Sequence, residues 1–341
     1  MRFRVLPGLV GGLLTIGCAP ASVDQPAADP SGMVDHHVHL LSPTLVADWK
    51  TLGVPFSRPD SIYTSAATLF TGDSASLDLA VLLPMGHLYG MEDFRDAMRL
   101  SEAEEAARTR GENAHVAAEA ARYPGRAVAF CSVAVFRPYA DEELRYCLDS
   151  LPTAGLKLHL AASGADLTDE AQLDRLVILF ARAESAGLPV LLHFDPQRRG
   201  LEVADVERFI ARVLDPRPGL ELYLAHLGGS GGYGPWTRSV FGAFREWMLR
   251  NPGRPVFAEL SAVLLEAESE GVPASTDEEA RALGEDLRAL GLERVVFGTD
   301  YPVFDPRRYR AALAARTGLT GDELATIAGN RGPLLRTLGG R

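Results

Sequence analysis

The sequence predicts an α/β protein whose strands close into a single (β/α)₈ TIM barrel. Short apolar, β-branched segments alternate with helical segments, and the alternation occurs eight times over roughly 300 residues. The segment after the first strand, Leu41-Ser42-Pro43-Thr44, lacks the glycines of a dinucleotide-binding loop. An open doubly wound sheet would favour such a loop at this place, so the barrel is preferred.

The expected strands are apolar runs of strand length. They are residues 33–40, 77–84, 126–135, 154–160, 188–194, 219–226, 254–261 and 293–300. Helical patterns rich in Ala, Leu, Glu and Arg fall between most of them, at 91–122, 139–150, 168–186, 202–214, 236–251 and 275–290. Residues 52–76 show no clear period, and we expect an inserted loop or lid there. Residues 33–341 are therefore expected to form one domain.

The composition excludes several classes of protein. The 341 residues carry 34 Lys and Arg against 45 Asp and Glu, which gives a net charge of −11. A negative surface repels phosphate backbones, so we expect no nucleic-acid partner. A hydrophobic content of 47% with 23% charged residues is typical of a folded chain with a large core.

The N-terminus is typical of an export signal. Arg2 and Arg4 precede an apolar run over residues 5–17, which is shorter than the roughly 20 residues that span a bilayer. Residues 1–18 resemble a bacterial lipoprotein signal in which Cys18 becomes lipidated. Cleavage after Ala21 would instead give a soluble exported protein, and a periplasmic location fits either outcome. Residues 19–32, rich in Ala, Pro, Ser and Asp, are expected to be a flexible linker.

Two cysteines remain after the signal. Cys131 lies in a strand-like run and Cys147 in a helical one. A disulfide would be permitted in an oxidising compartment, but two cysteines in about 300 residues do not make a disulfide scaffold. We therefore expect two buried thiols in preference to one disulfide.

The first strand contains a candidate metal motif, Asp35-His36-His37-Val38-His39. Side chains alternate along a strand, so Asp35, His37 and His39 should share one face, and His36 should face outward against the helices. Two imidazoles at i and i+2 can converge on one metal ion. Pairs of histidines also serve as buried hydrogen-bonding groups, and the motif alone does not decide between these roles.

Three later strands end in a residue that can bind metal or transfer a proton. The apolar runs reach His193, His226 and Asp300 at their carboxyl ends. In a parallel barrel these ends meet at one rim, where the loops build the active site. Each residue alone could as well emerge into solvent or cap a helix. Together they predict a metal site at the C-terminal rim of the strands.

This ordered set resembles the amidohydrolase superfamily, in particular the amidohydrolase-related branch (amidohydrolase 2), which contains metal-dependent hydrolases and decarboxylases. The resemblance covers residues 33–338. The matching segments are Asp35–His39, Gly155–His159, His193, Ala225–Gly229, Gly298–Pro302 and Ala328–Asn330.

The resemblance implies one divalent metal ion held by His37, His39, His193 and Asp300, and Zn²⁺ is the ion that it favours. It further implies that Asp300 and His226 are catalytic, through proton transfer and orientation of a metal-activated water. The expected reaction is hydrolysis of an amide, ester or lactone bond in a small molecule. A decarboxylase or hydratase of the same fold is the first alternative, and a non-catalytic metal- or solute-binding envelope lipoprotein is the second.

Several further residues have weaker assignments. Lys157 is expected either to bind a substrate carboxylate, to bridge a second metal ion if carbamylated, or to form a structural ion pair. His159 and Glu259 are expected to bind substrate. Glu259 and Ser261 share one strand face, and they could line the pocket or only stabilise the mouth of the barrel. His87 is expected mainly as a surface residue of a rim loop, with substrate contact as the alternative, and His115 as a solvated helix residue. The oligomeric state is left open.

Overall fold

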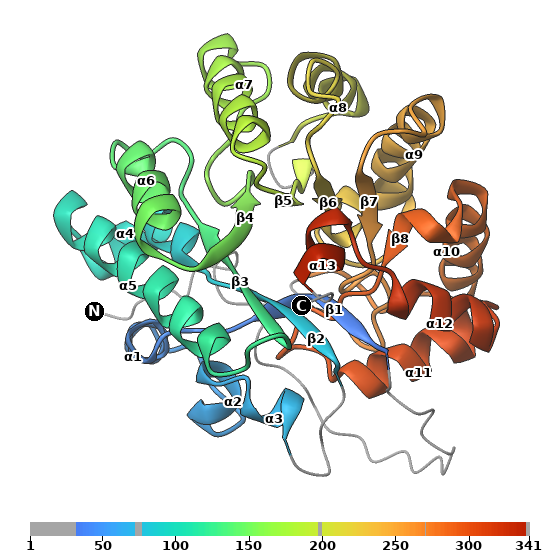
Figure 1. Cartoon of the computed structure of the whole chain (residues 1–341), viewed down its shortest axis with the longest axis horizontal. Helices are drawn as coiled ribbons and strands as arrows, with labels where there is room; N and C mark the ends of the chain where they lie inside the picture. The colour runs from blue at the N-terminus through green and yellow to red at the C-terminus, as the bar shows by residue number, and fades with distance from the viewer. Residues whose placement is uncertain (1–31, 72–76, 197–199, 270, 339–341) are drawn as a thin grey trace.

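The strands form one eight-stranded parallel sheet in the order β1-β2-β3-β4-β5-β6-β7-β8 (Figure 1). The computed structural model describes residues 32–71, 77–196, 200–269 and 271–338. The expected signal, with Cys18, and the linker up to residue 31 lie outside these residues. Backbone bonds from His36 N–H to the Phe297 carbonyl, 2.9 Å, and from Asp300 N–H to the His37 carbonyl, 2.9 Å, join the last strand to the first. The predicted (β/α)₈ barrel is confirmed.

Seven of the eight strands lie inside ranges that the sequence predicted, and β4 begins one residue before its predicted range. The strands are β1 Val34–His39, β2 Leu79–Leu83, β3 Ala127–Ser132, β4 Thr153–His159, β5 Val190–His193, β6 Leu222–Leu224, β7 Val256–Glu259 and β8 Val295–Val296. Apart from β4, they are shorter than the apolar runs, because the runs continue into the loops at either end.

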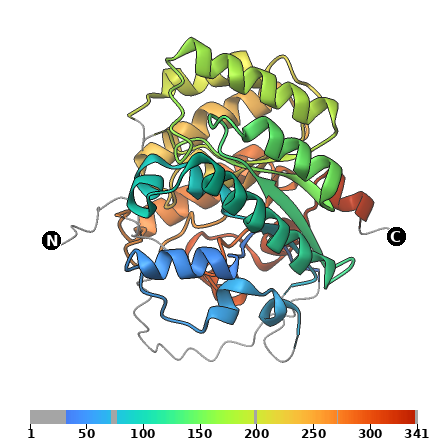
Figure 2. The ribbon, with the colours of Figure 1, turned by 90° about the vertical axis from the view of Figure 1, so that its left-hand side faces the viewer.

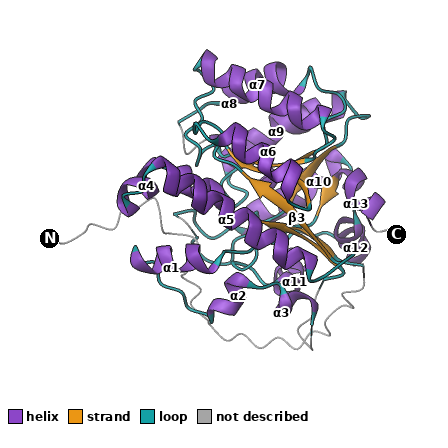
Figure 3. Cartoon of the chain, turned by 60° about the vertical axis from the view of Figure 1, so that its left-hand side comes forward, coloured by secondary structure: helices purple, strands orange, loops and turns teal. Residues whose placement is uncertain are grey.

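The helices surround the barrel, as Figure 3 shows with the strands enclosed by helices. The α-helices are α1 Pro43–Thr51, α2 Asp60–Thr64, α3 Ala67–Phe70, α4 Glu92–Met98, α5 Glu102–Ala121, α6 Ala140–Ser150, α7 Glu170–Ser185, α8 Val203–Phe209, α9 Pro235–Arg250, α10 Asp277–Leu290, α11 Pro306–Arg316, α12 Gly321–Gly329 and α13 Pro333–Leu338. Shorter helical turns are η1 Gly86–Gly90, η3 Ile210–Leu214, η4 Ala225–Gly228 and η5 Leu292–Arg294. Among the described residues, no helix has the length and apolar character needed to span a bilayer.

The helix expected over 91–122 is two helices. Arg99 ends α4 in the left-handed region, with φ 54°, which breaks the helical path. Ser101 then begins α5 with a capping box, because its side chain accepts from Glu104 N–H and the Glu104 side chain accepts from Ser101 N–H. Figure 2 shows α5 crossing the outside of β3.

Two apolar layers hold the barrel. One lies between the strands and the helices. The other fills the barrel interior with residues such as Val34, Val81, Tyr223 and Val296, and Leu335 of α13 joins it. Because Leu335 packs with the first residues of the strands, α13 closes the amino end of the barrel, and the carboxyl end is left to hold a site.

The segment expected as a loop or lid contains two short helices, α2 and α3. Tyr63 packs in an apolar cluster with Trp49 of α1 and Phe94 of α4. The Tyr301 hydroxyl lies 3.0 Å from Thr68 Oγ1 and donates to the Ile62 carbonyl at 3.3 Å. The segment is therefore tied to the chain that follows β8.

Cys131 and Cys147 form a disulfide, so the expectation of two thiols is wrong. Cys131 on β3 faces α6, and packing of this helix against the strand brings the two Cα atoms to 6.2 Å. That separation is ordinary for a disulfide. Both residues are buried, and sequence separation alone could not show that strand and helix would meet at these positions.

Candidate metal centre

A β-bulge in β1 aims two consecutive histidines into the barrel. Asp35 pairs with Ala80 and Val38 with Leu82, so one more residue of β1 than of β2 lies between the paired positions. His37 and His36 therefore both point inward.

The expectation that His36 faces outward is wrong for this reason. Its ring lies 5.3 Å from the ring of Tyr223, on the other side of the barrel, and its Nδ1–H donates to the Phe297 carbonyl at 3.0 Å. Burial lowers the pKa of His36 to about 4.

Asp35 does not share the inward face of His37. Its carboxylate accepts from the backbone N–H of His37 at 2.9 Å and of Thr299 at 3.1 Å, and from Thr299 Oγ1 at 2.5 Å. Burial raises the pKa of Asp35 to about 7, although these hydrogen bonds lower it. Asp35 thus ties together the two strands that carry His37 and Asp300.

Three predicted ligands meet at one point: His37, His39 and Asp300. Their ligand atoms lie within 4.8 Å of one another. The Nε2 atoms of the two histidines are 3.1 Å apart, and Asp300 Oδ1 lies 3.4 Å from the first and 3.3 Å from the second. Burial would raise the pKa of Asp300, but its hydrogen bond with His39 and the neighbouring His226 and Lys157 hold that pKa at about 2.

The tautomers of His37 and His39 leave their Nε2 lone pairs available to bind a cation. His39 Nδ1–H donates to the Leu83 carbonyl at 3.3 Å, and His37 Nδ1–H donates to Glu259 Oε2 at 3.1 Å. Both Nε2 lone pairs therefore face each other beside a carboxylate, an arrangement that a cation between them makes favourable. Nitrogen and carboxylate donors backed by such hydrogen bonds are the ligands that zinc and related divalent ions prefer.

Glu259 lies behind this group with its hydrogen bonds taken by the protein. Besides His37, its carboxylate accepts from Ser261 Oγ at 2.6 Å, Ser261 N–H at 2.7 Å and His226 N–H at 3.4 Å. Burial raises the pKa of Glu259 to about 8. These partners are those of a residue that orients ligands, and the expected substrate contact of Glu259 stays a prediction.

Gly298 makes room for Glu259. A Cβ atom at position 298 would lie 1.6 Å from Glu259 Oε1 and 3.1 Å from the Cβ of His37. The glycine before Thr299 and Asp300 is therefore required by the close approach of β7.

His226 lies beside the cluster as a neutral base. Its Nδ1–H donates to the Ser261 carbonyl at 2.9 Å, so its Nε2 carries the lone pair. Its ring lies 4.8 Å from that of His37, and burial lowers its pKa to about 4. A second trio that could hold an ion, His37, His226 and Glu259, shares this region.

His193 lies one ring further away than the other predicted ligands. It stacks on His159 at 3.7 Å and meets His226 edge-on at 4.4 Å. None of the three-residue groups within 4.8 Å in the described chain includes it, so its role as a ligand stays a prediction.

Lys157 is brought directly to the cluster. Its Nζ donates to His37 Nε2 at 3.1 Å, and the side chain is fully buried. Burial lowers the pKa of Lys157 to about 8, although Asp300 and Glu259 raise it.

His87 is also part of this wall, and the expectation of a surface histidine is wrong. It is only 1% exposed and its ring lies 5.2 Å from that of His159. The reason is that η1 packs against α5 and β3 and does not project into solvent. His115 is half-buried, contrary to expectation, and its Nε2–H donates to the Thr64 carbonyl at 2.9 Å.

The backbone is strained where the strands end in this site. Five residues other than glycine, all in the segments that follow β5, β6, β7 and β8, have φ between 44° and 65°: Asp195, His226, Leu227, Ala262 and Asp300. Such conformations cost free energy and cluster at functional sites. Nothing in the local sequence predicts them.

A buried polar stripe on α5, which the sequence did not predict, supports the site from outside the barrel. Asn113 binds the backbone of Ser132 through both ends of its amide, at 2.8 and 3.0 Å. Glu112 accepts from Ser42 N–H at 2.8 Å and Met85 N–H at 3.3 Å. The available signal was polar residues at helical spacing on a face that is otherwise apolar.

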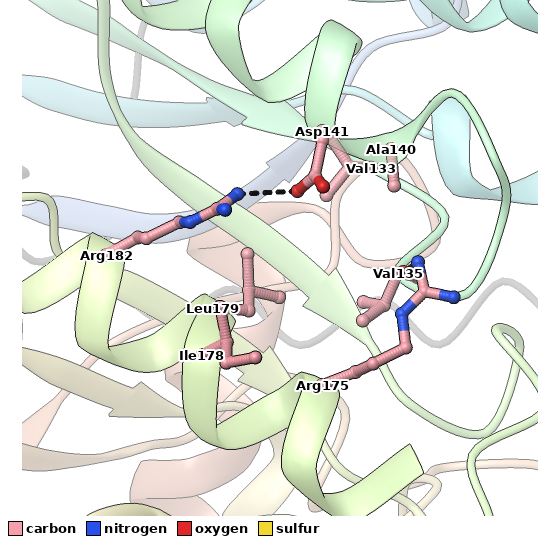
Figure 4. A pocket seen from close by; sticks show the side chains of 8 residues that line it. All are labelled: Val133, Val135, Ala140, Asp141, Arg175, Ile178, Leu179 and Arg182. Carbon is pink, nitrogen blue, oxygen red and sulfur yellow. Dashed lines mark hydrogen bonds and ion pairs between the residues drawn. The ribbon is translucent and has the colours of Figure 1, made fainter. Parts of the chain in front are cut away.

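A separate cavity lies on the outer wall between α6 and α7 (Figure 4). It has a volume of about 130 Å³. Ile178 and Arg182 are among its lining residues, and an ion pair of 2.6 Å joins Arg182 to Asp141. None of its lining residues belongs to the metal cluster.

The fold is a (β/α)₈ barrel, and the residues gathered at its carboxyl end could hold a divalent metal ion. The family described as Amidohydrolase (Amidohydro_2) matches residues 34–330. The chain belongs to this amidohydrolase family, an enzyme family that is metal-dependent, and the resemblance stated above is confirmed. No curated protein matches the chain.

Solved structures with the same fold include several decarboxylases. A 2,6-dihydroxybenzoate decarboxylase in complex with 2,6-dihydroxybenzoate aligns with a TM-score of 0.59 and 17% identity over 90% of this chain and 99% of its own. A dihydroxybenzoic acid decarboxylase from Polaromonas sp. JS666, with bound manganese and 2-nitroresorcinol, aligns at 0.58 and 14% over 90% and 96%. The 5-carboxyvanillate decarboxylase of Sphingomonas paucimobilis aligns at 0.56 and 15% over 87% and 96%. At identities this low, the similarity to these structures shows a shared fold and nothing more.

Proposed function

We propose that the protein is a metal-dependent hydrolase that cleaves an amide, ester or lactone bond of a small molecule. The observation that carries the proposal is the convergence of two imidazole lone pairs and the Asp300 carboxylate on one point. His37, His39 and Asp300, joined by His193, would hold one Zn²⁺ ion. When bound, such an ion polarises a carbonyl group and lowers the pKa of water.

The residues around this point are suited to moving a proton. The Asp300 side chain is 21% exposed, whereas that of Glu259 is 0% exposed, so Asp300 can meet a substrate and Glu259 can only act through other residues. Asp300 is ionised above a pH of about 2, which allows it to accept a proton and return it to a leaving group. His226 presents a neutral Nε2 lone pair beside it and can orient the attacking water.

Decarboxylation is the second candidate function. It is supported by the three structural neighbours above, which are decarboxylases of aromatic acids. In this case Lys157 and His159 would bind the acid.

The number of ions depends on Lys157. As an ammonium group it is compatible with one ion, whereas a carbamylated Lys157 would bridge a second ion, which His193 and His226 are placed to bind. We propose the single-ion form, because the trio of His37, His39 and Asp300 already brings its ligand atoms within 4.8 Å of one another without a contribution from Lys157.

We also propose that the protein is exported and that Cys18 carries a lipid. The sequence of residues 1–18 supports this, and the disulfide between Cys131 and Cys147 is compatible with an oxidising compartment. Cell fractionation of wild type and Cys18→Ser tests it. Membrane association that depends on Cys18 is expected, and equal cytoplasmic recovery of both chains would contradict the proposal.

The reaction is tested by product analysis on the Zn²⁺-loaded chain. We expect new carboxylate product from a panel of amides, esters and lactones, and no such product from the Asp300→Asn variant. Release of CO₂ from hydroxybenzoates without hydrolysis would replace the first candidate by the second. A chain that binds the ion but turns over neither panel would favour a binding protein.

A further inference from the structure

We propose that Ser261 is a positioning residue whose hydroxyl holds the rings of His37 and His226 in the orientation that the reaction needs. The inference rests on the proposed function for the roles of the two histidines, and it adds the residue that joins them. Ser261 is the second residue after β7 and is fully buried, so it acts through other residues. The orientation matters because one ring is a proposed metal ligand and the other is proposed to orient the attacking water.

The hydroxyl of Ser261 has three partners, which together use its full hydrogen-bonding capacity. It donates to Glu259 Oε2 at 2.6 Å, and it lies 2.9 Å from His37 Nδ1 and 2.9 Å from His226 Nδ1. A serine hydroxyl carries one proton and two lone pairs. With the proton directed to the carboxylate, the two lone pairs accept from the N–H groups of the two rings.

The other contacts of these groups assign the protons. The Ser261 carbonyl can only accept, and it lies 2.9 Å from His226 Nδ1, so the ring proton of His226 is on that atom. The two oxygens of Glu259 each accept a backbone N–H, from Ser261 at 2.7 Å and from His226 at 3.4 Å, which is the pattern of a carboxylate. His37 Nδ1 faces this carboxylate at 3.1 Å as well as the hydroxyl, so it carries a proton.

The same hydroxyl occupies the point where the second trio of candidate ligands converges. His37, His226 and Glu259 bring their ligand atoms within 4.8 Å of one another. Ser261 Oγ lies between 2.6 and 2.9 Å from a side-chain atom of each. An ion at this point would have to displace the hydroxyl and remove a proton from both rings. The trio is therefore a hydrogen-bonded centre that supports the first cluster.

The segment that carries Ser261 is held on both sides of this residue. The buried hydroxyl of Tyr309 on α11 donates to the Leu260 carbonyl at 2.7 Å. Gly232 N–H donates to the Ala262 carbonyl at 2.7 Å, and Ala262 is kept in the left-handed region with φ 51°. Because both neighbours are fixed, the hydroxyl is preorganised to hold the two rings.

The hydroxyl contributes something that Glu259 does not. It contacts both rings, whereas Glu259 contacts the ring of His37 and the backbone of His226. Each ring also keeps an acceptor of its own, since His37 has Glu259 and His226 has the Ser261 carbonyl. Removal of the hydroxyl should therefore loosen the two rings relative to each other and leave the surrounding fold intact.

The test uses a matched pair of variants, Ser261→Thr and Ser261→Val, whose side chains have nearly the same shape. Only the Thr variant keeps a hydroxyl. In a chelator competition on the full-length chain, Zn²⁺ affinity should stay within about threefold of wild type for Thr and fall by about 10-fold or more for Val. Ser261→Ala removes the hydroxyl without adding volume and should resemble Val, and it decides the question if the larger side chains prevent folding.

Ser239→Ala is the control for loss of a serine hydroxyl. Ser239 is exposed on α9, and its hydroxyl donates to the Pro235 carbonyl at 2.9 Å. This variant should keep wild-type Zn²⁺ affinity. Equal affinities of the Thr and Val variants, or wild-type affinity in Ser261→Ala, would overturn the proposal.

Two further measurements separate positioning from a general loss of stability. In the metal-free protein, ¹⁵N shifts should report Nδ1–H tautomers for His37 and His226 in wild type. In Ser261→Ala the His37 ring should become a mixture of tautomers, because one acceptor remains in place of two. On the panel substrate that wild type hydrolyses fastest, Ser261→Ala should lower kcat by about 10- to 100-fold with KM within about threefold. An Nε2–H tautomer of either ring in wild type would contradict the proposal.

The outcome can be separated from that of the proposed function, because the tautomers are measured without metal or substrate. If the protein hydrolyses nothing in the panel, but the tautomers and the Zn²⁺ affinity depend on the Ser261 hydroxyl, the proposed function fails and the positioning of the two rings stands. If hydrolysis is observed and Ser261→Ala keeps wild-type kcat and tautomers, only the inference fails.

Discussion

The two sides of the site use the same side chain for opposite chemistry. On the side built by β1 and β6, the Nδ1–H groups of His37, His39 and His226 donate to a carboxylate or to backbone carbonyls, and lone pairs face the cluster. On the side built by η1 and β4, the Nδ1 atom of His159 accepts from the backbone N–H of Ala162, which puts a ring proton on Nε2, and His87 Nδ1 lies 2.8 Å from the Ser132 hydroxyl. We call these the acceptor side and the donor side. The comparison shows that the partner of Nδ1, more than the histidine itself, decides whether a ring can bind a metal.

The largest expected effect is on the acceptor side, from Asp300→Asn. The variant loses a carboxylate ligand and the group proposed to transfer a proton, so turnover should fall by about 10³-fold or more. Thermal unfolding should be nearly unchanged. Asp322→Asn, on the exposed start of α12, is the matched control. Wild-type turnover in Asp300→Asn would remove Asp300 from the mechanism.

A smaller effect, on stability, is expected behind the donor side. The disulfide from Cys131 to Cys147 closes a loop with a sequence separation of 16 residues, next to Ser132. Replacing both cysteines by Ser should lower the free energy of unfolding by about 3 kcal/mol, measured by urea denaturation. Metal content should not change, because Cys131 and Cys147 do not belong to the groups around His37 that could hold an ion in the described chain. Loss of metal in this variant would show that the two sides are coupled.

The next effect concerns the residues that orient the acceptor side. Glu259→Gln weakens the hydrogen bond that fixes the tautomer of His37, so metal affinity should fall by about 10- to 100-fold in a chelator competition. If metal affinity were unchanged and only the KM for substrate rose, Glu259 would be a substrate contact, as the sequence first indicated.

The smallest effect is a pH dependence of the free energy of unfolding that arises from Glu112. This residue hydrogen-bonds to segments on both sides of the site. Glu112 accepts from Ser42 after β1 and Met85 after β2, and burial raises its pKa from 4.5 to about 7. Between these values the folded state binds a proton that the unfolded state does not, so stability should fall as the pH rises from 4.5 to 7. We expect a change on the order of 1 kcal/mol, because relaxation offsets part of the cost of burial. Denaturation of wild type and Glu112→Gln at several pH values checks it, and identical slopes would contradict it.

Much of the barrel was predictable because strand-forming runs are local. Runs such as Leu188–His193 are apolar, bounded by turn residues and short, and these properties belong to the sequence itself. The placement of His37, His39 and Asp300 at one rim followed from the topology of a parallel barrel.

The remaining features depend on contacts between distant residues. The bulge in β1 changed the direction of His36 and Asp35, and strict alternation could not foresee it. The tautomer of His39 depends on Leu83, which is 44 residues away. The burial of His87 likewise depends on how η1 packs against α5.

The most direct test of the account is the metal content of the purified chain by plasma mass spectrometry. We predict one divalent ion per chain in wild type, none in His39→Ala and one in His87→Phe, because only the first substitution removes a lone pair from the acceptor side. A folded wild-type chain that holds no ion after reconstitution with Zn²⁺ or Mn²⁺ would contradict the central claim.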